Sequence, residues 1–91
     1  MIRGNSVHPT SVNTDMVHTQ ATYDIFRTDL PAGSVTREDG DESFRTSLNL
    51  LPITWVEPVD ISNALVWLCS DVARYVTGVQ LPMDAGNAIK P

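Results

Sequence analysis

Residues whose types could support chemistry gather near the beginning of the chain. Ser6, His8 and Asp15 are the residue types of a nucleophilic triad, and His8 and His18 are potential metal ligands. Side chains this close together on a strand and a turn do not in general converge on one point, so we predict no triad. No second pair of ligands lies nearby at the spacing of zinc sites, and we therefore predict no metal site.

Composition and charge exclude several classes of function. The 91 residues include 6 Lys and Arg against 11 Asp and Glu, which gives a net charge of −5, and the arginines are scattered. A nucleic-acid binder needs clustered positive charge, so we predict no nucleic-acid partner. The longest apolar run, residues 64–69, is far shorter than the ~20 residues that span a bilayer. Cys69 is the single cysteine, and we interpret it as a small hydrophobic residue in a cytoplasmic protein that does not enter membranes.

Hydrophobic periodicity and turn residues divide the chain into two strands, three helices and a long polar loop. Thr14 or Asn13 would cap the first helix. The loop has the length that is typical of functional lids or disordered segments. The predicted elements, in order, are a strand over 2–8 ending at Pro9, a turn at 9–11, a helix over 15–26, a loop over 28–43, a helix over 42–51 ended by Pro52, a helix over 58–70 with a further turn through 71–75, a strand over 79–84 and an irregular tail from Ala85.

The helix over 58–70 has the strongest local signal. Pro58 suits the first helical position, and Asp60 favours the positive amino end of the helix. Its apolar positions recur at helical spacing. They are Ile61, Ala64, Leu65, Leu68 and Val72.

The order of the elements predicts the fold class. Two strands joined through a helix indicate a parallel pair with a right-handed crossover, which is the unit of α/β folds. Pro82 lacks a backbone donor, so the second strand is expected at a sheet edge. A sheet of two strands is rarely stable by itself, so we interpret the chain as part of a larger architecture.

Two segments together resemble classical short-chain dehydrogenases/reductases, on the carveol-dehydrogenase-like, mycofactocin-coupled branch. Residues 2–14 read Ile-Arg-Gly-Asn-Ser-Val-His-Pro-Thr-Ser-Val-Asn-Thr, and the usual family pattern there is I-R-V-N-x-V-x-P-G-x-V-x-T. Residues 57–86 resemble the last helix and the last strand of that family. The resemblance implies the carboxyl-terminal portion of a Rossmann-type, doubly wound parallel sheet.

The resemblance also implies site residues. Pro9 would shape a turn on the nicotinamide side of the cofactor, where Val12 offers backbone groups and the Thr14 hydroxyl helps to hold the carboxamide or a nearby phosphate. Thr10 replaces the glycine of the family pattern, and a positive φ there would be strained. From the residues alone, Thr14 is equally well explained as a helix cap and Val12 as a core residue.

Three parts follow from this resemblance: residues 2–14 as strand and nicotinamide-side turn, 15–55 as substrate lid, and 58–86 as last helix and strand. The cofactor would be NAD or NADP, and the substrate a small apolar or terpenoid-like alcohol or ketone. In the family that the chain resembles, the last helix and strand also build subunit interfaces. The resemblance therefore implies a homo-oligomer or a related subunit as the protein partner.

The family's catalytic groups have no counterpart among these residues. The Gly-rich pyrophosphate loop is missing, and Tyr23 with Arg27 has the spacing of Tyr-x-x-x-Lys but carries arginine. We therefore predict no catalytic residue in the chain and no hydride transfer by the chain alone. The alternative is a non-catalytic oligomerisation or interaction fragment, or a truncated remnant.

Overall fold

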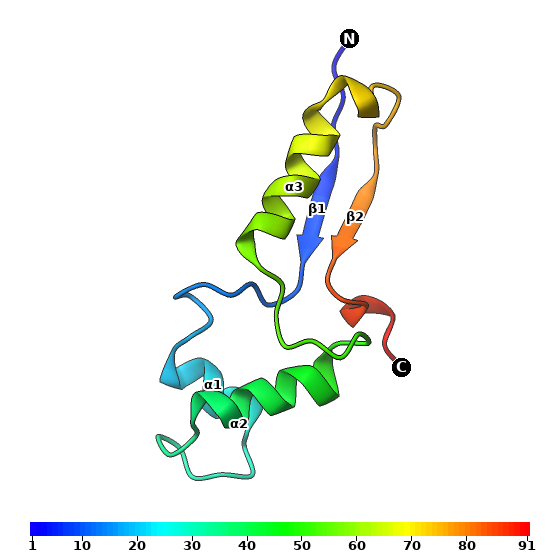
Figure 1. Ribbon diagram of the computed structural model, residues 1–91. Coiled ribbons are helices and arrows are strands. Elements are labelled where there is room, and N and C mark those ends of the chain that lie inside the picture. The colour runs from blue at the N-terminus through cyan, green and yellow to red at the C-terminus, as the bar shows by residue number, and fades with distance from the viewer.

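The computed structural model describes all 91 residues, as two small strands and a set of helices (Figure 1). Figure 1 shows two regions: a strand pair with a helix along it, and a separate group of helices. The elements are β1 (Ser6–Pro9), α1 (Gln20–Phe26), α2 (Arg37–Ser43), the π-helical turn η1 (Phe44–Leu48), α3 (Pro58–Cys69), the 3-10 turn η2 (Asp71–Ala73), β2 (Gln80–Met83) and the 3-10 turn η3 (Asn87–Ile89).

The two strands pair in parallel, as predicted, with Ser6 opposite Gln80 and Pro9 opposite Met83. The first strand is shorter than the predicted range 2–8. Before Ser6, one backbone bond runs from the Gly78 N–H to the Gly4 carbonyl, and a side chain makes the next bond. Asn5 Oδ1 accepts from the Val79 backbone N–H at 2.9 Å. The fold class is α/β, as predicted, with a parallel sheet of two strands.

Helix α3 confirms the strongest local prediction. Pro58 occupies the first helical position, and the Asp60 carboxylate accepts from the Glu57 backbone N–H at 3.4 Å. The helix lies along β1 (Figure 1), and Leu68 is its buried residue. The expected further turn is present as η2.

The first helix begins later than predicted. Thr19 caps it, because the Thr19 hydroxyl accepts from the Thr22 backbone N–H at 3.2 Å. The Thr14 carbonyl instead accepts from the backbone N–H groups of Val17 and His18, which closes a separate turn. The cap prediction at Thr14 or Asn13 was wrong, since several Thr and Asn residues precede the helix and only tertiary contacts choose among them.

The predicted loop over 28–43 was wrong in its second half. Residues 37–43 form α2, and a reciprocal capping box starts it: Thr36 Oγ1 accepts from the Asp39 N–H, and the Asp39 carboxylate accepts from the Thr36 N–H. The predicted helix over 42–51 is instead α2 continued by η1, and it ends at Asn49 rather than at Pro52.

The tail from Ala85 is not irregular. Gly86 adopts a left-handed conformation, with φ of 77°, at the start of η3. The Asp84 carboxylate accepts from the backbone N–H groups of Gly86 and Ala88, both at 3.0 Å, and so caps the turn.

The molecule is elongated and leaves much apolar surface open. Its radius of gyration is 16.0 Å, whereas a compact domain of this length has about 12 Å. Only 7 residues are buried, and the exposed fraction of the Trp67 side chain is 45%. None of the helices is long and apolar enough to cross a bilayer.

Candidate functional site

The predicted site residues lie on one turn at the carboxyl ends of both strands. Because β1 and β2 are parallel, their ends meet at the same edge of the sheet, where α/β folds place ligands. Pro9 is the last residue of β1, and the Thr10 N–H donates to the Met83 carbonyl at 3.4 Å. Thr10 does not have a positive φ, so the strain that its replacement of glycine could bring does not arise.

Val12 presents a free backbone N–H on one side of this turn. It forms a parallel bridge with Val56, in which the Asn13 N–H donates to the Val56 carbonyl and the Val56 N–H donates to the Ser11 carbonyl. A parallel bridge uses the groups of the flanking residues, so the Val12 N–H and C=O point the other way. The Val12 N–H has no acceptor within the chain.

Thr14 is exposed, and its hydroxyl donates to the Val12 carbonyl at 3.4 Å. Thr14 caps no helix, so helix capping does not explain the threonine at this position. A nicotinamide carboxamide has one carbonyl acceptor and one NH₂ donor. The Val12 N–H supplies a free donor, and the Thr14 hydroxyl, whose hydrogen is donated to the Val12 carbonyl, still offers an acceptor oxygen, so these residues fit such a group.

Asn49 joins the turn to the end of η1, and sequence reasoning missed it. The exposed fraction of Asn49 is 1%. Its Oδ1 accepts from the Thr10 hydroxyl at 3.3 Å, and its Nδ2 donates to the carbonyls of Ile53 and Thr54, both at 2.9 Å. The signal in the sequence is that Asn49 is a polar residue among leucines. This pattern does not show which atoms the Asn49 side chain binds.

His18 joins the turn to α1. Its Nε2 lies 2.6 Å from Asn13 Oδ1, and its Nδ1 lies 2.8 Å from the Tyr23 hydroxyl. Asn13 Nδ2 in turn donates to both carboxylate oxygens of Glu57 at 3.2 Å. Both ring nitrogens of His18 are therefore engaged with protein groups.

The other candidates from the sequence do not assemble into a site. Ser6 Oγ lies 2.7 Å from His8 Nε2 on the exposed strand, but no carboxylate bonds to His8, and Asp15 takes no part. No three His, Cys, Asp or Glu side chains lie close enough together to hold a metal ion. Cys69 is an exposed free thiol rather than a buried one.

Charged groups of the lid region shift one another's pKa values. A hydrogen bond from Arg27 lowers the pKa of Asp29, and the same bond raises the pKa of Arg27. The pKa of Asp39 is lowered chiefly by the backbone N–H of Thr36, then by the Thr36 hydroxyl. Arg27 is thus engaged with acidic neighbours instead of standing beside Tyr23 as a catalytic lysine would.

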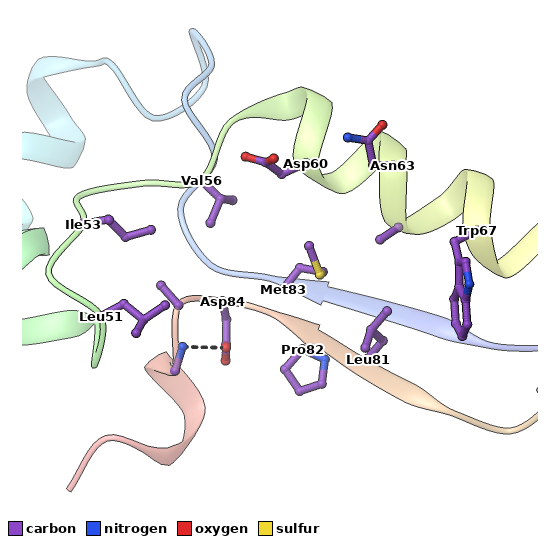
Figure 2. Close-up of a pocket in the computed structure, with 13 residues that line it drawn as sticks. Leu51, Ile53, Val56, Asp60, Asn63, Trp67, Leu81, Pro82, Met83 and Asp84 are labelled. Atoms are coloured by element: carbon purple, nitrogen blue, oxygen red, sulfur yellow. Dashed lines mark hydrogen bonds between the residues drawn. The ribbon is translucent and has the colours of Figure 1, made fainter.

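An open groove of about 760 Å³ lies between α3 and β2 (Figure 2). Its lining is mostly apolar and includes Ile53, Trp67 and Leu81. Asp84 lines it as well, but the Asp84 carboxylate is engaged with backbone N–H groups of η3. The sequence analysis did not predict this groove.

Comparison with known proteins gives consistent relatives, although no family profile matches the chain. The chain is 53% identical to (-)-trans-carveol dehydrogenase of Rhodococcus erythropolis over 89 residues, which cover 98% of the chain and 31% of that protein. It is 46% identical to a putative short-chain type dehydrogenase/reductase of Mycolicibacterium smegmatis, again over 98% of the chain and 31% of the relative.

Solved structures of similar proteins match the chain as well. The carveol dehydrogenase from Mycobacterium avium, a complex with NAD, matches 97% of the chain and 31% of its own length, with 44% identity and a TM-score of 0.87. A short-chain dehydrogenase family protein from Francisella tularensis matches 97% of the chain and 34% of its own length, with a TM-score of 0.73 and 21% identity, and so supports the fold alone.

The chain spans about a third of the length of these relatives. The motif order in residues 2–14 and 57–86, the parallel strand pair with its helix, and both sequence and structure comparisons agree on one assignment. These 91 residues are a carboxyl-terminal segment of the short-chain dehydrogenase/reductase family, on its carveol-dehydrogenase-like branch.

Proposed function

We propose that this segment supplies the nicotinamide-side turn and the substrate lid of an NAD(P)-dependent dehydrogenase. Residues 2–14 would form the strand and turn, 15–55 the lid, and 58–86 the last helix and strand. The supporting relatives are named as carveol dehydrogenase and NAD-dependent oxidoreductases, and one solved relative is a complex with NAD. The substrate would be a small apolar or terpenoid-like secondary alcohol, or the corresponding ketone.

The free backbone N–H of Val12 carries this proposal. The N–H and the C=O of Val12 point away from the Val56 bridge, at the edge where α/β sheets bind ligands. Val12 and Thr14 would orient the carboxamide, and Pro9 would hold the turn at the strand end. When bound, the cofactor supplies or accepts the hydride, and the chain's own contribution is orientation.

We propose further that these residues do not transfer a hydride without other groups. A proton must move to or from the substrate oxygen, and Tyr-x-x-x-Lys does not occur in the 91 residues. Tyr23 is hydrogen-bonded to His18, and Arg27 is paired with Asp29. Neither side chain is available for that step.

A titration of NADH fluorescence with the 91-residue chain tests the cofactor role. We expect saturable binding at micromolar concentration, and no oxidation of a secondary alcohol such as carveol. Val12→Pro removes the free N–H without breaking a bond inside the chain, whereas Val12→Ala keeps it. Loss of NADH binding in the proline variant alone would support the proposal. Turnover by the wild-type chain, or equal binding by both variants, would contradict it.

A non-catalytic interaction fragment is the second candidate, and the apolar groove between α3 and β2 favours it. Trp67 and Leu81 there have no covering partner in the chain. Sedimentation of the same samples separates the two functions. Self-association together with no response to NADH would favour the interaction role, and NADH binding by a monomer would favour the cofactor role.

A further inference from the structure

We infer that His18 is a positioning residue that couples the substrate lid to the nicotinamide-side turn. The coupling runs from Tyr23 in α1 through the imidazole to Asn13, which lies between Val12 and Thr14. Its existence is a property of the chain alone, and its effect on cofactor binding rests on the proposed function.

The hydrogen-bond partners determine the orientation of the Asn13 amide. A carboxylate only accepts hydrogen bonds, so the group that faces Glu57 must be the NH₂ of Asn13. The amide oxygen therefore faces His18. Since that oxygen also only accepts, His18 Nε2 must carry the hydrogen in the 2.6 Å contact.

The same logic assigns the second ring nitrogen. With a hydrogen on Nε2, the neutral imidazole has an acceptor at Nδ1, and the Tyr23 hydroxyl at 2.8 Å must donate to it. Each group in the series from Tyr23 to Glu57 then has one defined role. Rotation of the imidazole would break both of its bonds.

Packing holds both ends of this connection. The exposed fraction of Tyr23 is 8%, and a Cβ added at Gly40 in α2 would lie 3.0 Å from the Tyr23 ring. The ring of Trp55 meets the His18 ring edge-on, with centroids 4.6 Å apart. At the other end, the Asn13 N–H is bonded to the Val56 carbonyl.

This arrangement couples two parts of the proposed site. A displacement of α1 carries Tyr23 with it and pulls on Asn13, and Val12 and Thr14 flank Asn13 directly. Because coupling between two sites is reciprocal, occupation of the turn would also restrain α1. His8 offers the contrast, since its only polar partner is Ser6 two residues away on the exposed strand.

Long-range proton–nitrogen NMR on the ¹⁵N-labelled chain tests the assignment without a mutation. We expect His18 to show a single tautomer with hydrogen on Nε2 near neutral pH, and His8 to show exchange between forms. A His18 spectrum with hydrogen on Nδ1, or an exchanging average, would overturn the inference.

Tyr23→Phe tests the coupling. Loss of the hydroxyl removes the donor to Nδ1, so we expect the His18 Nδ1 resonance to shift and the backbone amides of residues 11–14 to shift with it. Tyr75→Phe is the matched control, because the exposed fraction of Tyr75 is 84% and its hydroxyl has no hydrogen bond. Unchanged amides at residues 11–14 in Tyr23→Phe would contradict the coupling.

NADH titration of both variants separates this inference from the proposed function. If the chain binds NADH, Tyr23→Phe should weaken binding a few-fold and Tyr75→Phe should leave it unchanged. Equal affinities would contradict an effect on the cofactor. If the wild-type chain does not bind NADH, the proposed function fails, and the NMR result still decides whether His18 couples the lid to the turn.

Discussion

The proposed lid, residues 15–55, and the sheet region, which comprises β1, α3 and β2, differ in how they are held together. Five of the seven buried residues lie between residues 15 and 55, and the rings of Phe26 and Phe44 pack there with centroids 4.5 Å apart. The sheet region is held by the strand ladder and by α3 on one side, while Val66 and Trp67 remain exposed. The lid thus contains a small core of its own, and the sheet region depends on surfaces that other groups would cover.

Because residues 15–55 contain an aromatic core of their own, we expect the two regions to lose structure separately. The connections between them include polar side-chain bonds and a close approach of Gly86 to Leu50. They are the His18 series, the Asn49 bonds, and the contacts of residues 84–90 with the end of η1.

Phe44→Ala should unfold the lid and spare the sheet region. Phe44 is 1% exposed and contacts the rings of Phe26 and Trp55. Truncating a buried phenylalanine costs about 3–5 kcal/mol. Hydrogen exchange by NMR should show lost protection in α1 and α2, with α3 retained. Leu65→Ala, at an exposed position, is the control, and simultaneous loss of both regions in Phe44→Ala would contradict their independence.

Gly86→Ala should be more harmful than Gly78→Ala. Both glycines have positive φ, 77° and 73°, so an added Cβ brings a similar backbone strain at each. At Gly86 that Cβ would lie 2.6 Å from the Leu50 Cβ, whereas at Gly78 it would meet open space. We expect an additional cost of about 1–3 kcal/mol at Gly86, as for overpacking. Thermal unfolding followed by circular dichroism measures it, and equal costs would show that the tail moves freely away from Leu50.

Thr10→Val should weaken the connection between the lid and the sheet region that runs through Asn49. The change keeps the side-chain shape and removes the hydroxyl that bonds the buried Asn49 Oδ1. A hydrogen bond of this kind contributes about 1 kcal/mol. Amide shifts of residues 49–54 should report the change, and Thr28→Val on the exposed loop is the control. Unaltered amide shifts at Asn49 would mean that the hydrogen bond between Thr10 and Asn49 does not stabilise the fold.

Acid should weaken the start of α2. The pKa of Asp39 is lowered from its ordinary value of 3.8 by the Thr36 backbone N–H and then by the Thr36 hydroxyl. A carboxyl whose pKa is lower in the folded state stabilises the fold above its ordinary value, and this stabilisation is lost as the pH falls through the lowered pKa. Carbon chemical shifts of residues 36–40 measured below pH 4 should show the loss. Asp39→Asn should remove this pH dependence, and a wild-type-like acid response in that variant would assign it to other carboxyls.

Local signals explain which elements were predicted correctly. Pro58, Asp60 and the apolar stripe lie within one segment and report on one helix, so α3 was found nearly to the residue. The helix α2 was missed although Thr36 and Asp39 form a local capping box, because Gly40 and the dense charge argued for a loop. Gly40 instead sits against the Tyr23 ring, a contact that no local pattern reveals.

For the candidate site, the placement of the residues could be predicted from the sequence. Pro9, Val12 and Thr14 are neighbours in the sequence, so the resemblance was enough to place them on one turn. Their roles in cofactor binding stay predictions.

The sequence by itself determined the α/β class, the parallel strand pair and the membership of the family, because these depend on periodicity, turn residues and motif order along the chain. Only the tertiary structure decided that Val12 keeps its N–H free, that Asn49 reaches Thr10, and that His18 bonds both Asn13 and Tyr23. The physical reason is that a hydrogen bond needs two atoms within about 3 Å. Asn49 lies 39 residues from Thr10 along the chain, and folding alone brings the two together.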